Sequence, residues 1–230
     1  MQETIIKFIK KLAVKNNKSF LEIVRILDAI SWSGFEKLAK VKISKKEFYF
    51  FQNIINDILL EEEWKNLISD KRSKLFESNY KFDKSNPKLL YNSIGKIRTA
   101  LRSRNYCAVY YQHANGEKGF RLIEPYFMGQ GYKKGDKISQ EHFKDYYLRS
   151  FVIKDTVTDS TVKFNKPKSV SVSENLPYWR LLRVDRILNL VIIRRRFSFY
   201  REGFNGFGDG NIVKKLASVE FNEFKGMNTF

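Results

Sequence analysis

Two short stretches of the sequence combine aromatic rings and arginines at the spacing of a β-strand. In the first, YYLRSF, which begins at Tyr146, alternation places Tyr147 and Arg149 on the same face of the strand. A ring can stack on a nucleobase, and a guanidinium beside it can bind a phosphate. This pair therefore predicts a binding site for nucleic acid or a nucleotide.

The second stretch, WRLLRVDRI, begins at Trp179 and reads as the start of one strand that continues to Ile193. Alternation puts Trp179, Arg183 and Asp185 on one face, so Arg183 and Asp185 are neighbours. They either form an ion pair that locks the rim of the sheet or contact a ligand, and the sequence leaves both open. Arg186 falls on the apolar face, which requires a bulge or an exit at the end of the sheet.

Residue types and spacing indicate no catalytic set, metal site or cofactor site. His113 and His142 lie far apart in polar stretches, and Cys107 lies in a strand-like run. The consecutive acids Glu61, Glu62 and Glu63 cannot all point at one ion from a helix. We therefore expect a protein that is not an enzyme and that needs no metal or cofactor.

The charge balance predicts a polyanionic partner. The 230 residues include 43 Lys and Arg against 25 Asp and Glu, a formal net charge of +18, and 43% hydrophobic residues provide for a folded core. Nucleic acid is the first candidate for such a partner. The alternative is that lysine simply fills a solvated surface. A single cysteine excludes an internal disulfide and fits a reducing compartment.

Residues 1–86 are predicted to form a helical region. Apolar residues recur with helical spacing from about Thr4 to Phe76, and Ser19 and Ser44 each precede a glutamate by three positions, the pattern of a capping box. Residues 19–41 fit a helix-turn-helix, although plain helix packing explains them as well. This region is therefore expected to bind DNA or to contact a partner protein.

Residues 87–230 are predicted to form a β domain with a leading helix. Pro87 opens that helix, and the apolar period changes to alternation after Asn105. The helix is predicted to bury a stripe of Leu90, Ile94, Ile97 and Leu101 and to carry Lys96, Arg98, Arg102 and Arg104 on its outer face. The dipeptide Asn115-Gly116 predicts a hairpin. Five or six short strands without an intervening long helix favour a small barrel. The whole chain is thus expected to be α+β.

Four segments of this second region resemble the WYL-domain family. They read AVYYQHANGEKGFRLIEPYFMG, DYYLRSFVI, SVSENLPYWRLLRVDRI and REGFNGFGDG, and the resemblance covers about residues 94–210. It matches the family's Arg-x-Ile/Val-x-Pro segment, its Trp-Tyr-Leu-like strand and, most strongly, its closing Arg-x-Asp-Arg-Ile strand. Tyr146 stands where the family's tryptophan would be, and residues 129–145 are longer than the usual connection.

The resemblance implies an SH3-like β-barrel of the WYL type in a nucleic-acid- or nucleotide-binding regulatory protein, such as a transcriptional regulator. Family members follow helical DNA-binding segments and sense ligands in bacterial and phage regulators, and several bind single-stranded nucleic acid. Together with the two strands above, the resemblance gives these candidate ligand-binding residues: Tyr147, Arg149, Arg183, Asp185, Arg186, Trp179, Ser171 and Arg121.

The predicted partner is single-stranded DNA or RNA, or a nucleotide, with a protein partner at the N-terminal helices. The alternative is a non-enzymatic assembly protein of a phage or ribonucleoprotein particle that neutralises polyanions. A third class, an enzyme such as a nuclease, would need clustered carboxylates to hold metal ions. No apolar run approaches the roughly 18–20 residues that span a bilayer, and the N-terminus lacks a signal-peptide core. We therefore expect a cytoplasmic protein with no membrane contact.

Overall fold

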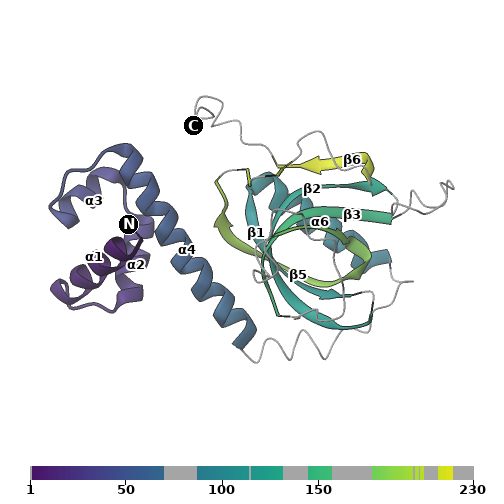
Figure 1. The fold of residues 1–230 in the computed structure, drawn as a ribbon, viewed down its shortest axis with the longest axis horizontal. Coiled ribbons are helices and arrows are strands. Elements are labelled where there is room, and N and C mark those ends of the chain that lie inside the picture. The colour runs from purple at the N-terminus through teal and green to yellow at the C-terminus, as the bar shows by residue number, and fades with distance from the viewer. Residues whose placement is uncertain are drawn as a thin grey trace. The chain divides into compact units, whose positions relative to one another are not determined.

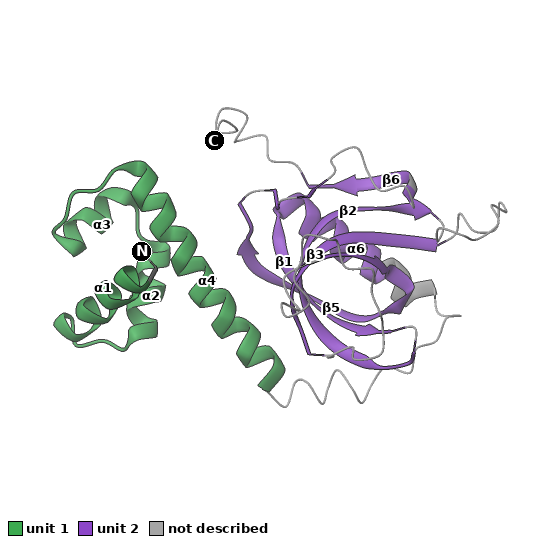
Figure 2. Cartoon of the chain, in the orientation of Figure 1, with its two compact units in different colours: residues 1–69 green, residues 70–230 purple. Residues whose placement is uncertain are grey.

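The computed structural model divides the chain into two compact units, residues 1–69 and residues 70–230 (Figure 2). The structure describes residues 2–69, 87–113, 115–131, 145–156, 178–198, 200–201, 203–204 and 212–219. Helices come first and an antiparallel sheet follows, which confirms the predicted α+β class. A domain boundary at 86/87 stays a prediction.

Unit 1, residues 1–69, consists of helices whose starts are set by serine caps. Ser19 and Glu22 form a capping box: the Ser19 N–H donates to Glu22 Oε2 at 2.7 Å and the Glu22 N–H donates to Ser19 Oγ at 3.2 Å. Ser44 and Glu47 repeat the arrangement. Both predicted capping boxes are confirmed, and these bonds lower the pKa of each glutamate. The helices are α1 (Gln2–Lys15), α2 (Phe20–Ala29), α3 (Trp32–Ala39) and α4 (Lys45–Ser69).

Aromatic and aliphatic side chains from all four helices fill the core of unit 1. Phe35 of α3 and Phe51 of α4 pack at a ring distance of 4.7 Å, and Phe8 of α1 contacts both. Ile9, Ile23 and Leu27 surround them and are almost fully buried. Only Ile30 and Ser31 separate α2 from α3. A helix-turn-helix in residues 19–41 stays a prediction.

Unit 2, residues 70–230, is built on a six-stranded antiparallel sheet, and in its described residues the helix α6 precedes the sheet (Figure 1). The strand order is β4-β3-β2-β1-β5, and β6 pairs with the far end of β2. The predicted hairpin at Asn115-Gly116 joins β1 to β2, with a φ of 92° at Gly116, and is confirmed. The elements are α6 (Pro87–Ser103), β1 (Asn105–Gln112), β2 (Lys118–Gly131), β3 (Asp145–Asp155), β4 (Tyr178–Arg183), the 3-10 turn η2 (Val184–Arg186), β5 (Ile187–Arg196) and β6 (Ile212–Ser218).

The sheet is curved but not closed. Its edge strands β4 and β5 are joined directly by the three-residue turn η2, so the two edges must come close together. Among the described residues, however, β4 and β5 form no ladder with each other. An SH3-like barrel is therefore not confirmed. The prediction of one strand from Trp179 to Ile193 is wrong, because the strand ends at Arg183 and a new one begins at Ile187.

One face of the sheet is covered by α6. The helix packs against β1, β2, β5 and β6, and its Ile97 and Leu101, both predicted to be inward-facing, are fully buried. Lys96, predicted to lie on the outer face, instead donates from Nζ to the carbonyl oxygen of Leu190 at 3.1 Å. Cys107 is fully buried in β1, as expected of a packed strand residue, and burial raises its pKa.

The helices in the described ranges include none long and apolar enough to cross a membrane.

The contact between β2 and β6 leads to a prediction about stability. A Cβ atom at Gly129 would collide with the backbone of Lys214 and the side chain of Ile212 in β6. We expect Gly129→Ala to lower the free energy of unfolding by about 1–3 kcal/mol, as overpacking does, measured by chemical denaturation of the full chain. The matched control is Gly95→Ala in α6, where a Cβ meets no atom within 4 Å. It should raise stability by about 0.5–1 kcal/mol through helix propensity. Equal changes in stability for the two variants would contradict the close contact between Gly129 and β6.

Candidate nucleic-acid interface

The positive charge of the chain is concentrated in unit 2. Residues 1–69 contain 12 lysines and arginines against nine acids, whereas residues 70–230 contain 31 against 16. Unit 1 is thus close to neutral for its size. A surface that attracts a polyanion is therefore to be sought first in unit 2.

Two distant segments that together carry five arginines lie side by side where α6 passes into β1 and where β5 ends. Asn105 at the start of β1 pairs with Arg196, and the Phe197 N–H donates to the Arg104 carbonyl oxygen at 2.9 Å. Three of the five side chains are exposed and two are half-buried. We call this set the arginine cluster; it consists of Arg102, Arg104, Arg194, Arg195 and Arg196.

Sequence reasoning did not single out the arginine cluster as a site. Three consecutive arginines, residues 194–196, were the available signal, followed at once by the aromatic-rich run FSFY. A run of basic residues interleaved with rings is the pattern of a nucleic-acid surface. The contribution of Arg102 and Arg104 depends on a tertiary contact and could not be read from spacing.

An ordered stack of aromatic rings follows β5. Trp179 of β4 lies 5.9 Å from Phe204 with 25° between the ring planes, and Phe204 lies 4.7 Å from Tyr200 with 6° between the planes. Trp179 packs edge-on against Tyr126, which is fully buried. Tyr200 at the other end is 42% exposed. We call the three rings Trp179, Phe204 and Tyr200 the aromatic stack.

An ion pair between half-buried Arg201 and fully buried Glu124 holds this segment on the sheet. The Arg201 guanidinium donates from Nε and Nη2 to the Glu124 carboxylate at 2.9 and 2.7 Å, and Glu124 is fully buried in β2. The Tyr126 hydroxyl donates to Glu124 at 3.1 Å and accepts from the Arg201 backbone N–H at 3.1 Å. These bonds to Glu124 raise the pKa of Arg201, while burial raises that of Tyr126. Arg201 is therefore fixed by both its side chain and its backbone.

The structure places Tyr147 and Arg149 on one face of β3, as alternation predicted. Tyr147 pairs with Arg183 and Arg149 with Leu181 across the β3–β4 ladder. Tyr147 is only 5% exposed, so in this structure its ring is covered. Arg149 is half-buried, and burial lowers its pKa. A ligand role for these two residues stays a prediction.

Arg183 and Asp185 form the ion pair that the sequence left as one of two alternatives. Arg183 donates from Nε and Nη2 to the Asp185 carboxylate at 3.0 and 2.6 Å, and Asp145 lies 3.4 Å from Nη2. The hydrogen bonds to Asp185 raise the pKa of Arg183. The Arg183 backbone N–H also donates to the Tyr111 hydroxyl at 3.3 Å. The pair therefore secures the turn from β4 into η2.

The conflict at Arg186 is resolved by η2. Because the strand ends at Arg183, alternation no longer applies, and Arg186 lies half-buried in the 3-10 turn. Its charge is close enough to Tyr111 to act on that hydroxyl, lowering its pKa, although burial raises the pKa more strongly. Neither a bulge nor an inward-pointing strand residue is needed.

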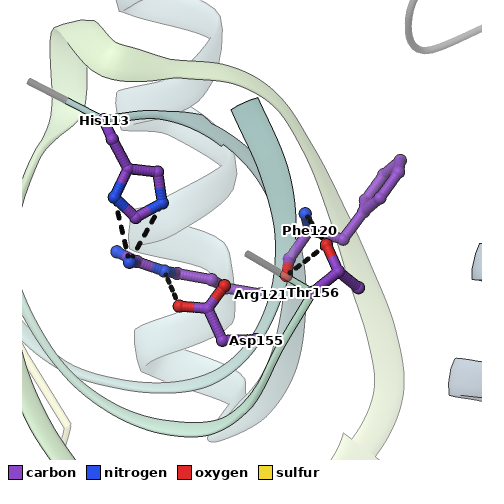
Figure 3. Close-up of polar contacts among 5 residues, drawn as sticks. All are labelled: His113, Phe120, Arg121, Asp155 and Thr156. Carbon is purple, nitrogen blue, oxygen red and sulfur yellow. Dashed lines mark hydrogen bonds and ion pairs between the residues drawn. The ribbon is translucent and has the colours of Figure 1, made fainter. Parts of the chain in front are cut away.

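Arg121 is buried in a polar cluster at the hairpin end of β2 (Figure 3). Its Nε donates to Asp155 Oδ2 at 2.7 Å, and its Nη2 lies 3.2 Å from His113 Nε2. The guanidinium also lies 5.0 Å from the Tyr111 ring centre. Arg121 is 3% exposed, so its contacts in this structure are internal, and a ligand role for it stays a prediction. Figure 3 also shows Phe120 and Thr156 tying β2 to the end of β3.

The remaining predicted residues have different outcomes. Trp179, a candidate for stacking, belongs to the aromatic stack but lies half-buried within it. Ser171 lies outside the described residues. Within the described ranges, no three His, Cys, Asp or Glu side chains gather into a group that could hold a metal ion.

The Glu124–Arg201 pair leads to a second prediction. Arg201→Gln leaves a fully buried carboxylate without its cation, so we expect the free energy of unfolding to fall by about 2–4 kcal/mol. The control is Arg25→Gln, which breaks the surface pair with Glu62 at 2.8 Å and should change stability by about 0–1 kcal/mol. Denaturant unfolding measures both.

Adding Glu124→Gln to Arg201→Gln removes the buried charge and should restore part of the lost stability. If Glu124→Gln lowers the stability of the Arg201→Gln variant as much as it lowers that of the wild type, the two residues are independent and the pairing is contradicted.

No protein-family model matches the chain, and no curated protein matches it. Among solved structures it is similar to proteasome accessory factor B/C (PafBC) of Arthrobacter aurescens, with 14% identity and a TM-score of 0.33. That match covers 50% of this chain and only 13% of the other. A likeness of this size carries no argument about fold or function, and the resemblance to the WYL-domain family rests on the sequence segments alone.

Proposed function

We propose that the protein binds nucleic acid through unit 2, as a regulatory protein and not as an enzyme. The observation that carries this proposal is the arginine cluster, in which a backbone contact brings Arg104, just after α6, beside the end of β5, where three consecutive arginines stand. Arginine binds phosphate oxygens in a bidentate manner and is less strongly hydrated than lysine. The cluster therefore suits a phosphodiester backbone.

A purely structural origin of the cluster explains it less completely. Arg102 lies in the last turn of α6, where a positive charge is favourable to the helix dipole. That argument does not extend to Arg194 and Arg196, which are exposed at the end of a strand. A local excess of positive charge attracts polyanions, which favours a phosphodiester strand as the partner.

We infer further that unit 2 is a WYL-like domain of SH3-like type and that nucleic-acid or nucleotide binding regulates transcription or a nucleic-acid-processing partner. The support is the run of four sequence segments, together with a curved sheet whose edge strands are joined by a 3-10 turn. The regulatory role rests on the family resemblance. Unit 1 would then contact DNA or a partner protein.

A second candidate is an assembly protein that neutralises polyanions without selecting among them. The excess of 31 basic over 16 acidic residues in 70–230 favours it, because charge alone gives non-specific binding. The two functions differ in where the affinity resides. A defined interface depends on particular arginines, whereas a neutralising surface depends on net charge.

The triple change Arg194→Gln, Arg195→Gln and Arg196→Gln tests the proposal. We expect weaker binding of a fluorescein-labelled single-stranded 20-mer, and the slope of log affinity against log salt should fall by about 2, since each phosphate contact contributes roughly 0.7. Fluorescence anisotropy across a salt series measures both.

The control removes the same charge from unit 1 through Lys10→Gln, Lys11→Gln and Lys15→Gln, all exposed on α1. It should leave the affinity nearly unchanged. If both triple variants bind equally less well, the neutralising function holds instead.

A further inference from the structure

The exposed end of the aromatic stack has the geometry of a stacking platform. One face of Tyr200 is covered by Phe204 at 4.7 Å with the planes only 6° apart, yet 42% of the residue remains exposed. Parallel rings at this centroid distance are stacked with an offset, one of the geometries that aromatic pairs prefer. The exposed part of Tyr200 can be covered by another flat ring.

Contacts of the neighbouring residues fix the positions of Tyr200 and Phe204. Arg201, the next residue, is fixed by its bidentate pair with Glu124 and by its N–H bond to Tyr126. Gly203, with a φ of 78°, allows the chain to turn so closely that a Cβ there would lie 3.3 Å from Trp179 Nε1. The turn brings Phe204 back onto Tyr200. A ligand ring therefore meets a surface that loses little entropy on binding.

The arginine cluster lies within reach of the same ligand. Arg196 precedes Tyr200 by four residues, so their Cα atoms are at most about 14 Å apart. That span corresponds to about four stacked nucleotides at 3.4 Å each. One strand can thus place its phosphates on the cluster and one base on the ring.

We infer that Tyr200 stacks an unpaired nucleobase of a single strand whose phosphates bind the arginine cluster. This inference rests on the proposed function and names its substrate class. A duplex fits less well, because its bases are already stacked on one another and are not free to cover the ring. Tyr147, the ring that strand alternation favoured for this role, is 5% exposed and offers no such face.

The experiment compares two single strands of 12 nucleotides, oligo-dT and a strand with the same phosphates but abasic positions in place of the bases. Wild-type protein should bind oligo-dT more tightly by about 5- to 150-fold, the range for stacking one base on an aromatic side chain. Tyr200→Ala should remove that preference and leave the affinity for the abasic strand unchanged. Tyr200→Phe, which keeps the ring, should retain it.

Two further variants serve as a second test and as a control. Tyr200→Leu preserves an apolar contact with Phe204 without a flat ring, so it covers the case in which Tyr200→Ala does not fold, and it should also lose the preference. Tyr49→Ala removes an exposed ring of unit 1, 60% exposed, and should change nothing. Thymidine monophosphate, added as competitor, should displace the strand only at concentrations far above those of oligo-dT, because it offers a single phosphate.

The outcomes separate the inference from the function it rests on. If wild-type protein binds neither strand at low salt, both are overturned. If it binds both strands equally, or if Tyr200→Ala and Tyr200→Leu keep the preference for bases, only the stacking role of Tyr200 is overturned. Displacement by the monophosphate at the same concentration as oligo-dT would replace the strand with a free nucleotide as the ligand.

Discussion

The buried carboxylate of Glu124 is the constraint on which the arrangement of unit 2 depends. A carboxylate without solvent is strongly destabilising unless its oxygens are bonded, and here Arg201 and Tyr126 donate hydrogen bonds to them. Arg201 belongs to the segment after β5, far along the chain from β2. The need to satisfy Glu124 thus determines where that segment lies, and with it the aromatic stack.

The long strand β2 contains two such constraints. Arg121 near its start is buried against Asp155 of β3, and Glu124 is buried against Arg201. Each buried charge fixes a different neighbour, and a shift of register by one residue would turn both charges to the other face. A one-residue slip would also turn the apolar side chains of β2 out of the core. The core and the two ion pairs together therefore specify one pairing of β2 with its neighbours.

Local rules of sequence predicted what depends on local contacts. The capping boxes at Ser19 and Ser44, the hairpin at Asn115-Gly116 and the buried side of α6 follow from spacing alone. Alternation then placed Tyr147 and Arg149 on one face of the strand. It could not show that Tyr147 is covered, because a strand can be packed on both of its faces. The break at Val184 was hidden by an apolar run that reads as one strand. The arginine cluster required knowledge that β5 ends beside Arg104.

The long-range contact that creates the arginine cluster is also part of the sheet. Pairing of Asn105 with Arg196 is a backbone interaction that stabilises the sheet, and it brings residues 102–104 beside residues 194–196. Under the proposed function a phosphodiester strand would bind this arrangement only in the folded state, because the unfolded chain spreads the five arginines apart. Binding and folding of unit 2 would then be linked, so that a polyanion would stabilise the contact on which its site depends.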